Sequence, residues 1–542
     1  MGAERIGGFQ CYHRNVTLRL AIPLFLLAGC SEDPRTDGSD TGATGEGVSG
    51  SEWFARASLD TRGYRPTLEE LAELPVDPAA LEEAVLELAD SPSLGQRLAW
   101  LWNERVHSVM WAFQVERFDV YEGEAWTQEN VQVAGQEVLQ FLRLLVDEDR
   151  SLRELVTAPG VPVHEGSPAH WPTTGGGSEW TWGSYTDDRP VSGVLSSPAM
   201  WLRYTDDALN YHRYRANALS KIFLCRDFFD KPAGLDFSFD ATESSIEDAV
   251  KTEPACLSCH ASLDPLGAHF GGFSEKSINF SSESFLSYSA FNDEWTTSLT
   301  PPAYFGHKSS GIESLGEFIA ADPRFSRCMV ETLYEGLVGL DFAEEADADA
   351  LVAMFREEDM QARPLVRAIL KLPSYRGRSE RLLTNAQLRS NWMHLLQVNP
   401  GDRAEDVLNA LVWDPELGVM GGAGDDVEIL IPSREATLSR AVLLEWAAKS
   451  VARDVLEQET QRDRASQQLL GVDLPIPEAE LPELFSRWLN LLTSRSLAPD
   501  SEEVERVMNL YRALAEGDDN AQSATLAEVL EALLQHPLGQ VY

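Results

Sequence analysis

Apolar residues recur three and four positions apart along most of this chain of 542 residues, whereas the alternation typical of strands is rare and short. Thr67 and Glu70 have the spacing of a capping box and predict a helix start. The tripeptide Ser91-Pro92-Ser93 predicts a break between two helices. Other long amphipathic stretches are residues 129–149, 436–464 and 499–517. The periodicity therefore predicts a mainly α fold.

Three segments share the form of a helical hairpin: a capped acidic helix, a second apolar helix, and a closing "SPS", "LPSY" or "HPLG". They are residues 57–97, 336–378 and 492–542. Any two amphipathic helices joined by a turn look similar, so the alternative is a chance likeness. We expect helical-hairpin modules, with long irregular loops between the first two.

Two stretches have the composition of such loops. Residues 164–190 gather aromatic side chains around Gly175–Gly177, and residues 272–306 contain strand-like fragments. Loops of this length are usually functional or disordered. The aromatic residues of the first are Trp171, Trp180, Trp182 and Tyr185. They either fasten the loop to the body of the protein or stack on a ligand or cofactor.

The N-terminus has the layout of a secretory signal. Arg14 and Arg19 precede the apolar run "LAIPLFLLAG", which is about half the roughly 20 residues needed to span a bilayer. The run ends at Cys30, and "LLAGC" resembles the lipobox of bacterial lipoproteins, which implies that Cys30 is diacylated and becomes the mature N-terminus. The alternative is a plain signal peptide with a chance cysteine. The polar stretch that follows predicts a flexible tether.

Charge limits the choice of partner. The chain has 87 Asp and Glu against 44 Lys and Arg, a net charge of −43, which repels a phosphate backbone and argues against nucleic-acid binding. This charge suits a soluble exported protein, or docking to a basic partner. The leader predicts that the protein is anchored in the cell envelope through Cys30 and faces the periplasm or the exterior.

The segment "EPACLSCHASLDPLG" contains Cys256, Cys259 and His260 in the spacing C-x-x-C-H. Two thiols at this spacing add to the vinyl groups of a haem, and the adjacent histidine is placed to bind the iron from the proximal side. Zinc would need a second ligand pair, which the sequence lacks, and a redox C-x-x-C usually lies in a βαβ unit. The sequence thus predicts one haem c, with zinc, a disulfide or an empty relic as alternatives.

The sixth iron ligand is open. His269 lies beyond "DPLG", which is expected to form a turn and let the histidine fold back, and Met329 offers a thioether. An open site is a further alternative that would permit peroxidase-like or ligand-sensing chemistry. Other residues available as ligands are Met200, His212 and His307.

Cys225 and Cys328 lie on either side of the haem motif. After removal of Cys11 with the signal and acylation of Cys30, they form one available pair outside the cytoplasm, as a disulfide or as two buried thiols. Arg213 and Arg215 suit haem propionates, although surface ion pairs are commoner.

Several segments together are similar to a family of large exported bacterial proteins, known from planctomycetes and myxobacteria, which are called cytochrome-like and consist of domains of unknown function. They include "SLDTRGYRPTLEELAEL", "EDRSLRELVTA", "ALNYHRYRANALSKIFLC" and "PACLSCHASLDPLGAHFGGF". The resemblance spans roughly residues 55–380 and is most specific at C-x-x-C-H-x-x-x-D-P-L-G. It implies a helical fold and a haem, but no substrate.

The chain departs from this family at three positions. Members often have an acidic residue where Gly271 and Ser274 stand, and Met where Leu263 stands. A side chain that touches haem or its propionates is therefore expected to be missing, and haem tuning or ligation is expected to differ.

The expected organisation has seven parts. They are a lipoprotein signal peptide (1–29), a flexible tether (30–52), an N-terminal helical domain (53–160), a Trp/Gly-rich loop (161–190), a cytochrome-like haem domain (191–340), a helical hairpin (341–380) and a C-terminal helical domain (381–542).

The expected function is one-electron transfer through a single haem to a redox partner in the cell envelope. An electron carrier is favoured over a catalyst. The alternatives are a binding or scaffold lipoprotein with a structural haem, and a haem enzyme with an open distal site.

Overall fold

The computed structural model describes residues 49–108, 128–167, 173–204, 212–228, 252–273, 288, 301–339, 345–377, 381–423, 433, 435–463, 467–515 and 522–541. The chain divides into two units, of which the first, Met1–Glu46, lies wholly outside these residues. The predicted signal peptide, Cys30 and nearly all of the tether therefore lie outside the described residues. The second unit, Gly47–Tyr542, contains all of the described residues.

The first helices begin where local capping chemistry predicts. Ser49 caps α1 (Gly50–Arg62) and forms a capping box with Glu52, so helix begins within the last residues of the expected tether. Thr67 and Glu70 form the predicted box of α2 (Leu68–Ala72). The predicted break at Ser91–Ser93 is confirmed, because α3 (Pro78–Glu87) and η3 (Leu88–Asp90) end before it and α4 (Leu94–Val106) begins after it.

The segment expected to be a long loop contains a small sheet. It follows α5 (Gln128–Asp147) and η4 (Leu152–Leu155) and precedes α6 (Pro198–Arg203). The strands β1 (Val161–Val163), β2 (Thr173–Thr174) and β3 (Thr181–Tyr185) pair antiparallel in the order β1-β3-β2. A Cβ at Gly183 would lie 2.5 Å from Thr174 O, so only glycine lets these strands approach. The glycines suggested a loop, yet this one is needed inside a strand.

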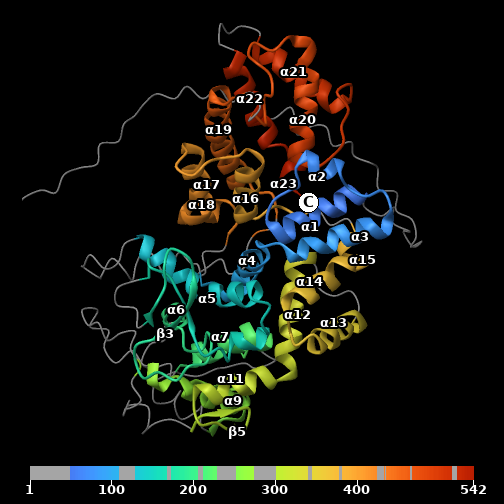
Figure 1. The fold of residues 1–542 in the computed structure, drawn as a ribbon. Coiled ribbons are helices and arrows are strands. Elements are labelled where there is room, and N and C mark those ends of the chain that lie inside the picture. Colours follow the sequence, from blue (N-terminus) through green and yellow to red (C-terminus); the bar gives the residue numbers. More distant parts are fainter. Residues whose placement is uncertain are drawn as a thin grey trace, which may run out of the picture. The chain divides into compact units, whose positions relative to one another are not determined.

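The next part of the chain, drawn in green and yellow in Figure 1, is helical with one short hairpin. Its elements are α7 (Arg213–Leu224), α9 (Pro254–Gly267), η5 (Ala268–Phe273), β4 (Ala303–Tyr304), β5 (His307–Lys308), α11 (Ile312–Ala321) and α12 (Pro323–Val338). The helix α7 packs against both α9 and α12. The hairpin that follows is α13 (Glu345–Glu357), α14 (Ala362–Lys371) and α15 (Pro373–Arg376).

The C-terminal part, orange to red in Figure 1, is helical in every element described. It contains α16 (Asn385–Leu395), α17 (Arg403–Trp413), α18 (Pro415–Met420), α19 (Leu438–Gln461), η7 (Glu478–Glu480), α20 (Leu481–Thr493), α21 (Glu502–Ala515), α22 (Gln522–Leu534) and α23 (Pro537–Gln540). The predicted mainly α fold is confirmed. In the described residues, no helix is both long enough and apolar enough to cross a bilayer.

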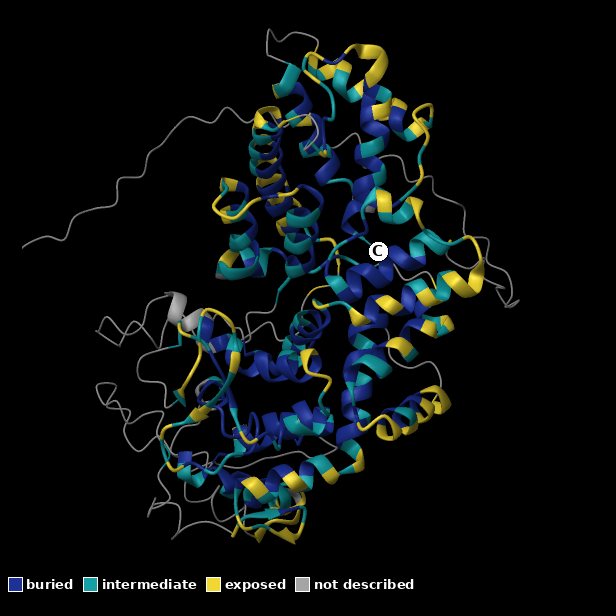
Figure 2. Cartoon of the chain, viewed as in Figure 1, coloured by how far each residue is buried: buried dark blue, intermediate teal, exposed yellow. Residues whose placement is uncertain are grey.

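Two hydrophobic cores organise these helices. The first runs from Trp53 to Tyr375, and the second contains Leu59 and residues from Leu383 to Leu534. The core therefore changes between Tyr375 and Leu383, beside the boundary expected at 380/381. Because Trp53 and Leu59 lie on the same helix, α1 contributes to both cores. Figure 2 shows buried and exposed stripes alternating along α19, as expected for an amphipathic helix that covers a core.

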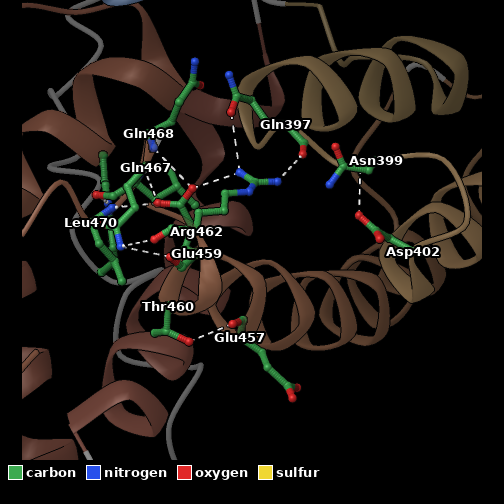
Figure 3. A network of polar contacts seen from close by, with 12 residues as sticks. Gln397, Asn399, Asp402, Glu457, Glu459, Thr460, Arg462, Gln467, Gln468 and Leu470 are labelled. Atoms are coloured by element: carbon green, nitrogen blue, oxygen red, sulfur yellow. Dashed lines mark hydrogen bonds and ion pairs between the residues drawn. The ribbon is translucent and has the colours of Figure 1, made fainter. Parts of the chain in front are cut away.

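A buried carboxylate fixes the chain after α19. Glu459 is fully buried, and its oxygens accept hydrogen bonds from the backbone N–H groups of Gln468, Leu469 and Leu470 at 2.9–3.2 Å. Arg462 Nη1 lies 3.0 Å from the same carboxylate and balances its charge (Figure 3). The side chain thus satisfies backbone donors that burial would otherwise leave unpaired.

Candidate functional site

The residues of the C-x-x-C-H motif lie on one helix face. Cys256, Cys259 and His260 are all in α9, and positions i, i+3 and i+4 of a helix point the same way. Pro254 begins this helix, where its missing N–H costs no hydrogen bond. Both cysteines are partly buried and are not joined in a disulfide. Sγ of Cys259 lies 3.6 Å from Phe228 O, beyond the end of α7.

His260 is held by a chain of polar contacts from the same helix and from α7. Its Nδ1 lies 2.9 Å from Oδ1 of Asp264. Arg213 donates to that carboxylate from Nε at 2.7 Å and from Nη2 at 3.0 Å. Burial alone would raise the pKa of Asp264, but the hydrogen bonds from His260 and Arg213 outweigh it and hold the pKa below its usual value. Asp264 is therefore a carboxylate, and the sequence reasoning missed it.

This contact fixes the tautomer of His260. An ionised carboxylate can only accept, so the hydrogen bond requires a proton on Nδ1, and in the neutral ring the lone pair is therefore on Nε2. Metal-binding histidines commonly have such a carboxylate or carbonyl partner, which orients the ring and makes it more basic. Two free thiols and this histidine on one helix face fit a covalently bound haem c. Asp264 could have been found from its position one turn after His260.

Both predicted propionate partners are engaged within the protein. Arg213 binds Asp264, as above. Arg215 is buried and donates to Tyr204 O at 2.8 Å and to Phe273 O at 3.0 Å, and its Nη1 lies 2.9 Å from Nδ1 of His212. These arginines hold α7 to α9, to η5 and to the end of α6.

The expected turn at "DPLG" is absent, which changes the position of His269. The helix α9 passes through Pro265 and is followed directly by η5. Nine helical residues advance by about 13 Å and rotate by about 180°, so His269 lies further along the axis on the opposite face from His260. The helical course of this segment therefore argues against the expectation that His269 folds back toward His260.

His269 instead belongs to the interior. Its side chain is 6% exposed, and Nδ1 donates to Leu266 O at 3.0 Å. Among the described residues, Nε2 has no hydrogen-bond partner. Burial lowers the pKa of His269 to about 4, against smaller opposing effects of hydrogen bonds to the carbonyls of Leu266 and Pro265, so the ring is neutral.

The other ligand candidates lie on four different elements. Met329 is buried on α12, Met200 is buried on α6, His212 caps α7 and is buried, and His307 is exposed on β5. Met329 therefore stays a prediction as the sixth ligand. In the part of the chain that the structure describes, no three His, Cys, Asp or Glu residues group as a metal site would require.

The second cysteine pair is bonded in the structure. Cys225, which caps the end of α7, forms a disulfide with Cys328 in α12, with the Cα atoms 5.3 Å apart. Nη1 of Arg105 lies 2.9 Å from Sγ of Cys225 and joins α4 to this point. Since α7 also packs on α9, the disulfide connects the neighbourhood of the haem motif to the first core.

Three of the four aromatic residues singled out in the Trp/Gly-rich segment lie within the described residues. Nε1 of Trp182 donates to Glu148, and Arg150 lies 4.7 Å above its ring, so this tryptophan fastens β3 to the end of α5. Trp180 stacks at a tilt on His164 within the segment. Arg189 lies 4.8 Å from the ring of Tyr185. Trp171 lies outside the described residues.

Two of the three departures from the cytochrome-like family can be placed. Leu263 is buried in α9 within the first core, and Gly271 lies in η5. Ser274 lies outside the described residues. Leu263 thus packs in the first core, at the position where members of the cytochrome-like family often have a methionine.

Comparisons with known proteins give no relative. No family model matches the chain, and neither a curated protein nor a solved structure matches it.

Proposed function

We propose that this chain is an exported, lipid-anchored, c-type cytochrome-like protein that transfers single electrons through one covalently bound haem. The observation that carries the proposal is the face of α9, where two unpaired thiols stand beside a histidine whose Nδ1 is already bound by Asp264. The resemblance to cytochrome-like exported proteins supports the same reading, and so does a leader addressed to the compartment in which haem is attached.

Each residue of the site would have a separate role. Cys256 and Cys259 would hold haem c through thioether bonds, and His260 would bind the iron through Nε2. The iron supplies the one-electron chemistry. Asp264 holds the ring of His260 in place and increases its electron donation, while Arg213 keeps Asp264 ionised. A redox protein of the cell envelope would exchange the electron, and acylated Cys30 would keep the protein at the bilayer.

The test is to express the full chain with its leader in a bacterium that matures c-type cytochromes. A pyridine haemochrome spectrum of the purified protein should show one covalent haem per chain. The variant Cys256→Ala/Cys259→Ala should lose it, whereas Cys225→Ala/Cys328→Ala, which removes the same number of cysteines from the disulfide, should keep it. Wild-type protein that is exported and folded but carries no covalent haem would refute the proposal.

The same preparation separates carrier from catalyst. A reduced protein that is six-coordinate and insensitive to carbon monoxide indicates electron transfer, whereas carbon monoxide binding indicates an open distal side. Replacing Met329 by Ala should create such an open side if its sulfur is the sixth ligand. A haem that no cell-envelope reductant can reduce would indicate a structural role.

A further inference from the structure

A cavity of about 150 Å³ lies between α4 and the helices α16 to α19, away from the haem motif in the sequence. Part of its wall is apolar, formed by Trp100, Leu411 and Val412. Trp100 is itself positioned by Trp413, with ring centroids 5.5 Å apart. A cavity of this size holds a molecule of about the size of benzene.

Arg97 brings a buried cation to this cavity. Its side chain is 6% exposed and lines the wall. Among the residues that the structure describes, Nε and Nη2 of Arg97 have no hydrogen-bond partner. Buried polar groups in native proteins are nearly always hydrogen-bonded, so this guanidinium is incompletely satisfied by the residues around it.

The nearest carboxylate does not neutralise Arg97. Asp60 is fully buried and lies 4.0 Å from Nη2 of Arg97, but it lies equally far from Nε of Arg56. Its Oδ2 also accepts a hydrogen bond from Tyr375 at 2.9 Å. One carboxylate is thus shared by two buried guanidinium groups, and this group of side chains keeps a net positive charge.

Arg440 adds a second buried cation to the lining of the cavity. It is 5% exposed, and it donates to Gly421 O at 2.7 Å and Leu383 O at 2.6 Å. Within the described part of the chain these partners are uncharged, and its Nε has none. Burial lowers the pKa of Arg440. Arg381 and Glu104 also line the cavity, and their opposite charges add no net charge to it.

We propose that this cavity binds a small monocarboxylic acid with an apolar or aromatic body. The carboxylate accepts a hydrogen bond from Arg97, Arg440 adds a second positive charge to the same lining, and the apolar body lies against Trp100, Leu411 and Val412. A planar guanidinium suits a carboxylate because two parallel N–H groups reach its two oxygens. A single charge matches the cation excess, and the apolar wall favours an organic acid over an inorganic anion.

The test is isothermal titration calorimetry of the full chain with benzoate, benzamide and sulfate. Benzamide has nearly the shape of benzoate without its charge. Benzoate should bind at least about tenfold more tightly than benzamide, since hydrogen bonds between charged groups are stronger than those between neutral groups. The variant Arg97→Met should weaken benzoate about tenfold or more. The control Arg506→Met, at an exposed arginine of α21, should leave the affinity unchanged.

A second variant covers the case in which Arg97→Met does not fold. Ala386 of α16 lines the cavity, and Ala386→Leu adds volume there without changing a charge. It should also weaken benzoate. Any of four results would overturn the proposal. The first three are benzamide binding as tightly as benzoate, sulfate binding more tightly than benzoate, and no binding of benzoate at millimolar concentration. The fourth result is an unchanged affinity for benzoate in folded Arg97→Met or Ala386→Leu. None of these residues belongs to the haem motif, so the result is independent of the proposed function.

Discussion

Nδ1 of His260 lies 2.9 Å from Oδ1 of Asp264, one helical turn further along α9. The same carboxylate accepts two hydrogen bonds from Arg213 at the start of α7. The histidine of the C-x-x-C-H motif is therefore oriented by a carboxylate of its own helix, and the carboxylate by a second helix.

This relationship predicts the effect of Asp264→Asn on the reduction potential. An amide is a weaker acceptor than a carboxylate, so His260 would donate less electron density and the potential of the haem should rise. Potentiometric titration followed by visible spectroscopy measures the change. Asp227→Asn is the control, because Asp227 pairs with Lys221 at the other end of α7. An unchanged potential in a protein that retains haem would contradict this role of Asp264.

His269 predicts a dependence of stability on pH. Its pKa is about 4 in the folded protein and 6.5 when unperturbed, so between these values the unfolded chain binds a proton that the folded chain does not. The free energy of unfolding should therefore rise with pH across this window, and the histidine should cost about 3 kcal/mol at its acid end. His269→Asn retains a donor for Leu266 O but does not titrate. Urea denaturation at several pH values should give a smaller slope for this variant, and equal slopes would exclude the effect.

The disulfide between Cys225 and Cys328 closes a loop with a sequence separation of 103. By the chain-entropy model, such a crosslink stabilises the fold by about 4–5 kcal/mol, because it restricts the unfolded chain. Cys225→Ala/Cys328→Ala should lower the free energy of unfolding by this order, as measured by denaturant titration. A reductant should destabilise the wild type and leave the variant unaffected. A wild type that is insensitive to full reduction would show that the crosslink contributes little.

Glu459 and Glu457 form a matched pair on α19. Glu459 is buried and accepts from three backbone N–H groups, whereas Glu457 is exposed. Glu459→Ala leaves these donors and Arg462 without their acceptor, so it should cost about 3–5 kcal/mol. Glu457→Ala should change stability by about 0.5 kcal/mol or less. Similar losses for the two variants, measured by chemical denaturation, would contradict the assigned role of Glu459.

Helix positions were predictable where the signal is local. The capping box of Thr67 and Glu70 and the break at Ser91–Ser93 depend on residues a few positions apart, and the structure has both. The segment "DPLG" misled because proline and glycine favour turns in isolation, yet Pro265 lies inside α9. There, packing of α9 on α7 outweighs the local preference. The small sheet at 161–185 was missed because its strands are short and the run Gly175–Gly177 between β2 and β3 is typical of a loop.

The sequence by itself determined the helical periodicity and the spacing of Cys256, Cys259 and His260, because both are properties of residues a few positions apart. Only the tertiary structure decided that Arg213 reaches Asp264, that Cys225 meets Cys328, and that Arg97 lies buried beside a cavity with Arg440 on its wall. These contacts join residues tens to hundreds of positions apart. Their formation depends on how the helices pack, which no local pattern specifies.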